Sequence, residues 1–399
     1  MKPSEESETE MRPPPPTVPV PVAMPAFRDW AGLSELPLSE VLRRLLPCVR
    51  SIHAFAAVCR PWRRLLRASA ADLLRPGMPP LLLNPRSRCV TAFARHLLAR
   101  PLAYRADLPA EGAILLSASR GHLLLILPRR GPSSQGEPRI LIVDAFTGAD
   151  RREIALPSPR FAYHYAALLP AHLLVFHSKH AFFSLPFPDP SPNPSSSGPR
   201  GWTKHSLPRS ASFVAGVLEF RGRVLGLTDR AQLLEFRLCA SPQGQIVRIL
   251  PAAGLPDATT FDRWHFGPRL VAAGDRLLLL LFMLEPKSGS SFKFARGVNK
   301  VAVYELDMAR MRWEEADNIG AYSLFVDYAG KSAAACTDVG SCGVQENRIY
   351  VAAPGCSWRS FPPGWEATPV DASSELFSRS AMERKPWTSN IWVYPQLFF

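Results

Sequence analysis

The chain has 399 residues, 47% of them hydrophobic, and a net charge of +13, and this length fits either a small module followed by one large domain or two domains. Its longest apolar run, residues 277–284, is too short to span a bilayer, and the acidic, proline-rich N-terminus does not have the pattern of a signal or transit peptide. The seven scattered cysteines without a CxxC pair are typical of free thiols, so we expect an intracellular protein of the nucleus, the cytoplasm or both, outside the membrane.

The positive charge is concentrated in one part of the chain. Residues 30–105 contain thirteen arginines and three acidic residues, a net charge of +10, whereas residues 1–29 have a net charge of −2. A basic stretch of this kind is one mark of nucleic-acid binding. No zinc-finger spacing and no basic motif interleaved with aromatic residues accompanies it, so we interpret the arginines as a solvent-exposed face and do not expect a nucleic-acid partner.

Shifts in composition divide the chain into four segments. Residues 1–27 contain a proline cluster and a Pro-Val repeat and are expected to be disordered. Residues 28–76 have apolar residues at helical spacing and form a helical module. Residues 77–104 begin with several prolines and are expected to be a connector. Residues 105–399 form a large domain of a different pattern.

The helical module is predicted to contain three short amphipathic helices between residues 30 and 67. Pro47 separates the first helix from the second, and Pro61 suits the first turn of the third helix. A unit of this size buries little apolar surface by itself. We therefore expect its apolar faces to dock against a partner, with an ordinary helical subdomain packed on the body of the chain as the alternative.

The large domain is predicted to be all-β. From about residue 105, short apolar runs alternate with turn residues, and few segments have a helical period. Two stretches, 140–157 and 301–320, each start with a strand that ends in an acidic residue, then turn and continue as a second strand. Such a unit is typical of a β-propeller blade, and about 40–50 residues per repeat would give about six or seven blades. A mixed β-rich fold is the alternative.

Residues 30–67 resemble the F-box. The resemblance is carried by Trp30, Leu33, Leu36-Pro37, Val41-Leu42, Leu45 and the run FAAVCRPWR at 55–63. It implies docking onto the Skp-type adaptor of an SCF (cullin-RING) ubiquitin ligase. It also implies that the adaptor is bound by apolar residues spread over the three helices: Leu33, Leu36, Pro37, Val41, Leu42, Leu45, Ile52, Phe55, Val58 and Trp62.

The large domain also has a family resemblance. Residues 303–336, 346–354 and 391–395 resemble the C-terminal propeller-like domain of a plant F-box family that is expanded in grasses and largely of unassigned function. Kelch repeats are a less close match, because no Gly-Gly pair occurs in the chain. The expected fold is therefore a small all-α F-box module followed by a large all-β, β-propeller-like domain.

The sequence contains no pattern of a catalytic or metal site. A GxSxG elbow, an HExxH motif, a GxGxxG loop and a phosphate-binding loop are all missing. His172, His177 and His180 lie close together without a companion cysteine or carboxylate pattern. We therefore expect neither enzymatic activity of the chain itself nor a cofactor or metal.

The function expected from these features is that of a substrate receptor in an SCF-type ligase. The F-box would hold the Skp-type adaptor and, through it, the cullin scaffold, while the β domain would hold a target protein that the sequence does not identify. One alternative is a stand-alone interaction protein with a degenerate F-box, because Leu36-Pro37 comes late and the spacing to Val58 contains about one extra residue. A basic nucleic-acid-binding protein is a further, less favoured alternative.

Overall fold

The structure is a computed structural model that places most of the helical module and most of the β domain. The expected disordered segment, residues 1–27, lies outside the described residues. The described residues are 32–45, 49–69, 80–84, 89–91, 103–105, 113–127, 138–144, 151–158, 162–187, 201–238, 246–257, 260–262, 265–284, 298–337, 339–340, 342–352, 358–366 and 390–393.

Three short helices precede the sheets, as the apolar spacing predicted. They are α1 (Glu35–Leu45), α2 (Val49–Val58) and α3 (Arg60–Ser69). Pro61 is the second residue of α3, where its missing N–H leaves no helical hydrogen bond unmade. In the described part of the chain, no helix is long and apolar enough to cross a membrane.

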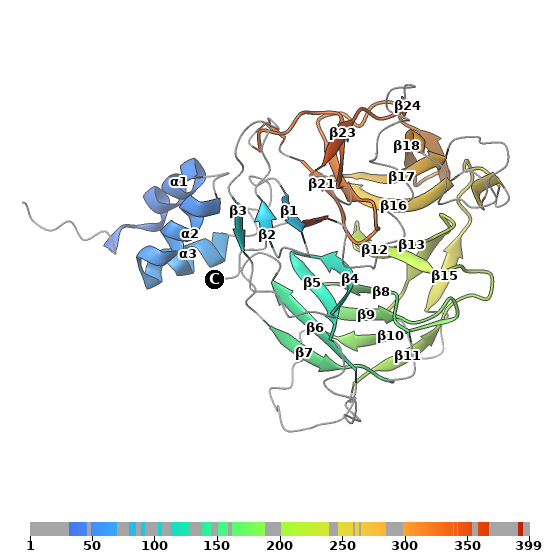
Figure 1. Cartoon of the computed structure of the whole chain (residues 1–399), viewed down its shortest axis with the longest axis horizontal. Helices are drawn as coiled ribbons and strands as arrows, with labels where there is room; N and C mark the ends of the chain where they lie inside the picture. Colours follow the sequence, from blue (N-terminus) through green and yellow to red (C-terminus); the bar gives the residue numbers. More distant parts are fainter. Residues whose placement is uncertain are drawn as a thin grey trace, which may run out of the picture.

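The strands of the described residues form six sheets, named A to F here (Figure 1). Sheet A comprises β25 (Ile391–Val393), β1 (Leu81–Asn84), β2 (Cys89–Thr91) and β3 (Ala103–Arg105). Sheet B comprises β4 (Ile114–Ser119), β5 (His122–Ile126), β6 (Arg139–Asp144) and β7 (Arg152–Ala155). Sheet C comprises β8 (Tyr165–Leu168), β9 (His172–Phe176), β10 (Ala181–Pro186) and β11 (Thr203–Ser206).

The remaining three sheets follow along the chain, and sheet F differs from the others in its strand pairing. Sheet D comprises β12 (Val214–Phe220), β13 (Arg223–Thr228), β14 (Leu233–Phe236) and β15 (Val247–Leu250). Sheet E comprises β16 (His265–Ala273), β17 (Arg276–Leu284), β18 (Val298–Asp307), β19 (Arg312–Glu315) and β24 (Trp365–Glu366). Sheet F comprises β21 (Ala333–Cys336), β20 (Ser323–Asp327), β22 (Arg348–Ala352) and β23 (Arg359–Phe361), and in it β20 and β22 pair in parallel.

The six sheets are arranged around a central axis, as in a β-propeller. The first strands of neighbouring sheets contact one another in the order β4, β8, β12, β16 and β21, and β25 contacts both β4 and β20. These contacts close a ring in which each sheet is one blade and its first strand faces the axis. The six blades agree with the lower of the two numbers expected from the repeat length.

Sheet A closes the ring by joining the two ends of the β domain. The C-terminal strand β25 pairs antiparallel with β1, with Leu82 opposite Trp392, and β1 pairs in turn with β2. The strands β1 to β3 lie between residues 81 and 105, in the stretch for which the sequence predicted a connector. That stretch instead belongs to the first blade, because β25 alone leaves one edge of the closing sheet without a hydrogen-bonded neighbour.

The apolar run at 277–284 shows why these residues form buried strands. It forms most of β17, the second strand of sheet E. Alternate side chains enter different cores: Leu277, Leu279 and Leu281 pack towards sheet D, while Leu278, Leu280 and Phe282 pack towards sheet F. A blade is covered on both faces by its neighbours, so its central strand is apolar at every position.

The two stretches interpreted as copies of one unit occupy equivalent places in two blades. Residues 140–157 contain most of β6 and all of β7, the third and fourth strands of sheet B. Residues 301–320 contain most of β18 and all of β19, the third and fourth strands of sheet E. The prediction that each stretch contains two successive strands is confirmed for this pair.

Candidate protein-interaction site

The three helices have a small apolar interior of their own. Leu38 and Leu42 of α1 face α2 and α3, where Ile52, Phe55 and Leu66 are also buried. Trp62 is half-buried and its ring lies 4.6 Å from the ring of Phe55, centroid to centroid. These helical residues and the buried leucines of β1 and β5 belong to one apolar cluster, consistent with the position of the helices beside sheet A in Figure 1.

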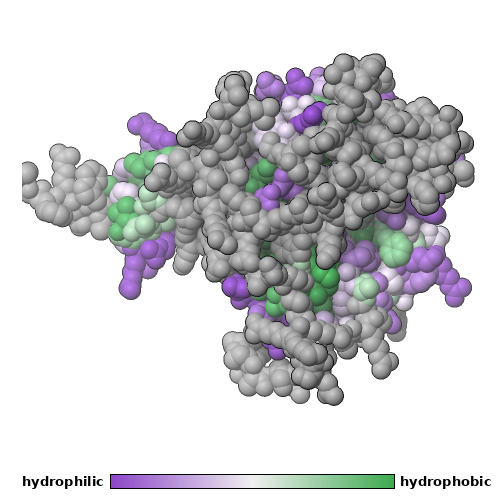
Figure 2. Space-filling view, in the orientation of Figure 1, coloured by the Kyte–Doolittle hydropathy of each residue, from purple (hydrophilic) through white to green (hydrophobic). Residues whose placement is uncertain are grey.

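A second set of apolar side chains on the helical module faces solvent. Leu33 just before α1, Leu36 and Val41 on α1, and Val58 at the end of α2 are exposed by 36%, 84%, 40% and 55%. We call these four side chains the helical patch. The described residues contain only two other exposed large apolar side chains, Ile114 and Phe213 on the propeller. Figure 2 shows apolar surface on the helical module beside strongly polar surface.

Charged residues are interspersed with the residues of the helical patch on α1 and follow them on α3. Glu40 accepts a hydrogen bond of 3.0 Å from Nε of Arg44 and lies 3.6 Å from a guanidinium nitrogen of Arg43. Arg63 donates from Nε to the carbonyl oxygen of Ala56 at 3.1 Å, which ties α3 to α2. Apolar side chains together with polar ones at their edge are the usual composition of a protein-interaction surface.

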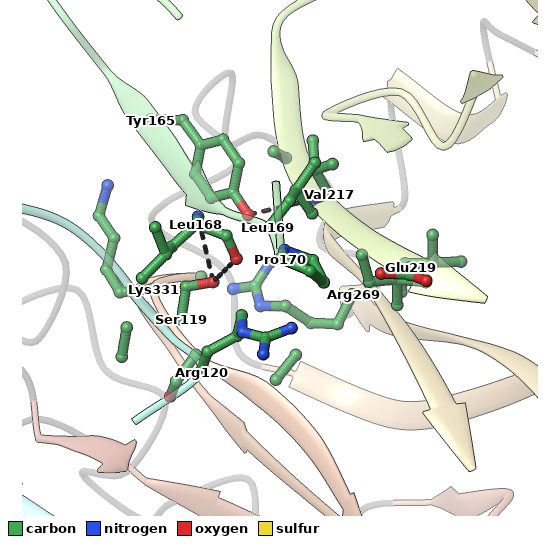
Figure 3. A pocket seen from close by; sticks show the side chains of 18 of the residues that line it. Ser119, Arg120, Tyr165, Leu168, Leu169, Pro170, Val217, Glu219, Arg269 and Lys331 are labelled. Carbon is green, nitrogen blue, oxygen red and sulfur yellow. Dashed lines mark hydrogen bonds between the residues drawn. The ribbon is translucent and has the colours of Figure 1, made fainter. Parts of the chain in front are cut away.

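The propeller contains a cavity on its axis, which we call the axial cavity (Figure 3). Its volume is about 570 Å³, and residues of β4, β8, β12, β16 and the β20–β21 turn line it. Ser119 at the end of β4 donates to the carbonyl oxygen of Leu168 at 3.0 Å and accepts from its N–H at 3.3 Å. Tyr165 accepts a hydrogen bond of 3.0 Å from the N–H of Val217.

A buried arginine forms one wall of the axial cavity. The guanidinium of Arg269 donates to the carbonyl oxygens of Pro268, Asp327 and Tyr328 at 3.0 to 3.3 Å. Arg269 is only 6% exposed. Burial lowers the pKa of this guanidinium, and the nearby charge of Asp327 raises it again. The carbonyls hold the cation in place where water cannot solvate it.

The turn after β20 is held by one carboxylate. Asp327 accepts hydrogen bonds from the backbone N–H of Lys331 and from both the N–H and the hydroxyl of Ser332. The hydroxyl oxygen of Ser332 in turn accepts from the N–H of Trp392 at 3.0 Å. Asp327 thus connects sheet F to β25 of sheet A, at the place where the ring closes.

Comparison with known proteins gives one family assignment. The KIB1-4 beta-propeller family matches residues 97–375, which is more than half of the chain. The chain belongs to the KIB1-4 β-propeller family. The match begins after α1 to α3, so it concerns the propeller and not the helical module. No curated protein matches the chain.

Solved structures give only weak likenesses to this KIB1-4 propeller. The Swd1 propeller of Myceliophteria thermophila is 12% identical with a TM-score of 0.33, and the alignment covers 79% of this chain and 95% of that one. A virginiamycin B lyase from Staphylococcus aureus is 13% identical with a TM-score of 0.29, covering 55% and 85%. Human WBSCR16 is 12% identical with a TM-score of 0.27, covering 57% and 74%. Scores this low add nothing to the family match.

The helical module of this KIB1-4 protein divides the ten expected adaptor contacts into three groups. Three of them are interior: Leu42, Ile52 and Phe55. Two are half-buried against the same interior: Leu45 and Trp62. Five are exposed: Leu33, Leu36, Pro37, Val41 and Val58. The sequence did not separate these groups, because a small helical unit uses similar apolar spacing for its own core and for a docking face.

The axial cavity of the KIB1-4 propeller was not predicted. Arg269 lies on β16 of sheet E, whereas Asp327 and Lys331 lie in the turn after β20 of sheet F, so the arginine meets this turn only when the two blades pack together. One signal was present: Asp327 ends an apolar strand and is followed by a turn with Gly330, the same pattern noted for the strands that end at Asp144 and Asp307. No group of three metal-ligating side chains occurs among the residues described.

Proposed function

We propose that this KIB1-4 protein is the substrate receptor of an SCF-type ubiquitin ligase. In this role α1 to α3 bind a Skp-type adaptor, and the propeller binds a target protein. The observation that supports the proposal is the helical patch, since most of the exposed large apolar side chains of the described chain lie on the helical module that resembles an F-box. Exposed apolar surface of this kind commonly marks a protein partner.

The proposed role requires no chemistry from the chain itself. A receptor accelerates ubiquitin transfer by holding the target close to the transfer machinery, which converts an encounter between separate molecules into a local event. A rigid propeller suits this task, because its six blades are fixed to one another by the closed ring. The family match and the propeller fold are compatible with a binding role.

Co-purification with a purified Skp-type adaptor tests the proposal. The informative variant is Leu36→Asp combined with Val58→Lys, which places charges in the helical patch. An acid in the first turn of α1 and a base at the end of α2 suit the helix dipoles, so both helices should remain folded. Leu42→Asp is not suitable, because Leu42 is fully buried and its replacement would unfold the module.

The matched control is Phe213→Asp, which charges an exposed apolar side chain on the propeller. We expect the wild type and this control to retain the adaptor. The double variant should retain at least about tenfold less adaptor than the wild type. Equal retention by all three proteins would contradict the proposal. Failure of the wild type to retain the adaptor would instead support the alternative of a stand-alone interaction protein.

A further inference from the structure

The axial cavity has the size and rigidity of a small-molecule site. Its volume of about 570 Å³ falls within the range of roughly 300–1,000 Å³ that is usual for ligand pockets. Its walls are the first strands of successive blades, which the closed ring holds in place. The cavity is therefore formed before any ligand arrives, and a ligand does not have to order it.

The charges that line the axial cavity are mostly positive. The lining contains four cationic side chains: Arg120, Arg221, Arg269 and Lys331. It contains one acidic side chain, Glu219, which is exposed. Asp327 lies behind the wall, where its carboxylate is already engaged by Lys331 and Ser332. An excess of positive charge in a concave, partly dry site attracts anions.

Two of these cations are held away from water. Arg269 is almost fully buried, and the ammonium of Lys331 donates to the carbonyl oxygen of His164 at 3.3 Å. Burial lowers the pKa of Lys331, the charge of Asp327 raises it, and the charge of Arg269 lowers it further. Burial thus disfavours the charge of both side chains, and an anion in the cavity would stabilise both.

Two side chains of the cavity wall, Tyr165 and Lys331, retain hydrogen-bond donor positions. The hydroxyl of Tyr165 accepts from the N–H of Val217, and no described residue accepts its proton. Lys331 has three donor positions, of which the carbonyl of His164 takes one. In Figure 3 the side chain of Arg120 extends from the end of β4 towards the middle of the labelled group. Donor-rich surroundings suit a group that only accepts, such as a carboxylate or phosphate.

We propose that the axial cavity binds a small organic anion that carries a carboxylate or phosphate group. Arg120 meets the anion at the mouth of the cavity, and Lys331 and Tyr165 supply donors from the wall. Arg269 contributes its charge, while the carbonyl oxygens keep its guanidinium in place. The axial cavity and the helical patch share no residues. Evidence against anion binding would therefore not bear on adaptor binding, and the reverse also holds.

Calorimetric titration of the full chain with citrate and with inorganic phosphate tests this site, at constant ionic strength and with glycerol as a neutral probe. The first variant is Arg120→Asn. Arg120 has a φ of 51°, a conformation that asparagine tolerates better than alanine, so the turn after β4 should be kept. Lys331→Met removes the second cation. We expect each variant to weaken binding of citrate or phosphate about tenfold.

Two further variants of the chain test whether the anion binds inside the cavity. Glu219→Gln removes the one acidic residue of the lining and should tighten binding several-fold. Arg310→Ala removes an exposed arginine at the far edge of sheet E, paired with Asp307, and should change nothing. The proposal is wrong if neither anion binds better than chloride, if Arg120→Asn binds like the wild type, or if an acidic peptide binds there and neither small anion does.

Discussion

Gly330 is the residue on which the position of Arg269 depends. It has a φ of +72°, and a Cβ atom built on it would lie 2.9 Å from Cζ of Arg269. The guanidinium has no room to move, because three carbonyl oxygens hold it. The absence of a side chain at this position therefore fixes both the turn after β20 and one wall of the axial cavity.

Replacement of Gly330 by alanine should lower the free energy of unfolding by more than the backbone strain alone would. The matched control is Gly222→Ala, since Gly222 has the same φ of +72° and nothing within 4 Å of the added Cβ. We expect Gly222→Ala to lower the free energy of unfolding by about 1 kcal/mol, and Gly330→Ala to lower it by about 1–3 kcal/mol more. Urea unfolding measures both changes. Equal losses of stability in the two variants would show that Arg269 moves aside for the added methyl group at little cost.

His164 should make stability depend on pH. Burial is the main reason why the pKa of His164 is lowered to about 4. A hydrogen bond to the Val214 backbone raises this pKa, and the charges of Lys331 and His177 lower it, each by a smaller amount. As the pH falls below 6.5, the unfolded chain binds the proton first, so stability is lost between pH 6.5 and about 4.

The variant His164→Phe keeps an aromatic ring beside Phe213 and removes the titrating group. The wild type should lose up to about 3 kcal/mol more stability than this variant between pH 7 and pH 4, since one pKa unit corresponds to about 1.4 kcal/mol. Denaturant unfolding across this range gives the difference. Parallel curves for the two proteins would mean that His164 is protonated as readily in the fold as in the unfolded chain.

At the scale of elements, the pairing of β25 with β1 is the contact that closes the propeller. It joins the most distant parts of the β domain and contributes Trp392, which is 1% exposed and lies 5.0 Å from the ring of Phe325 in sheet F, centroid to centroid. One short strand therefore carries interactions with both neighbouring blades. Its loss should affect the whole ring and not one sheet alone.

Trp392→Ala tests this dependence. Removing a buried tryptophan typically costs about 3–5 kcal/mol, and the loss should appear as a lower midpoint of a single transition for the whole β domain. Phe213→Ala is the control, because that ring is exposed and its removal should cost less than about 1 kcal/mol. Thermal unfolding by circular dichroism measures both. A small effect of Trp392→Ala would contradict the role given to β25.

For the whole molecule, the sequence predicted the helices and strands, which depend on local residue patterns. It missed the features that form only when the ring of blades closes. Helical spacing around Leu42 and Phe55 predicted the helices, and runs such as residues 277–284 predicted strands. The first blade was missed because β1, β2 and β25 are short and because β25 pairs with β1 across more than 300 positions of the chain. The axial cavity was missed for the same reason, since Arg120, Arg269 and Lys331 become neighbours only around the axis.

The propeller covers one part of the helical module and leaves the helical patch exposed. The interior of the helices and the core of sheets A and B form one apolar cluster, so the propeller covers part of the module. Leu36 and Val58 are left exposed although the chain contains a large apolar core that could have covered them. This distribution is expected when the second face of the module serves another protein.

The most direct test of the account is the dissociation constant between the purified full chain and a purified Skp-type adaptor. We predict saturable binding by the wild type, at least about tenfold weaker binding by the Leu36→Asp, Val58→Lys double variant, and unchanged binding by Phe213→Asp. Circular dichroism should show that all three proteins are equally folded. Absence of binding by the wild type, or equal dissociation constants for the three proteins, would contradict the account.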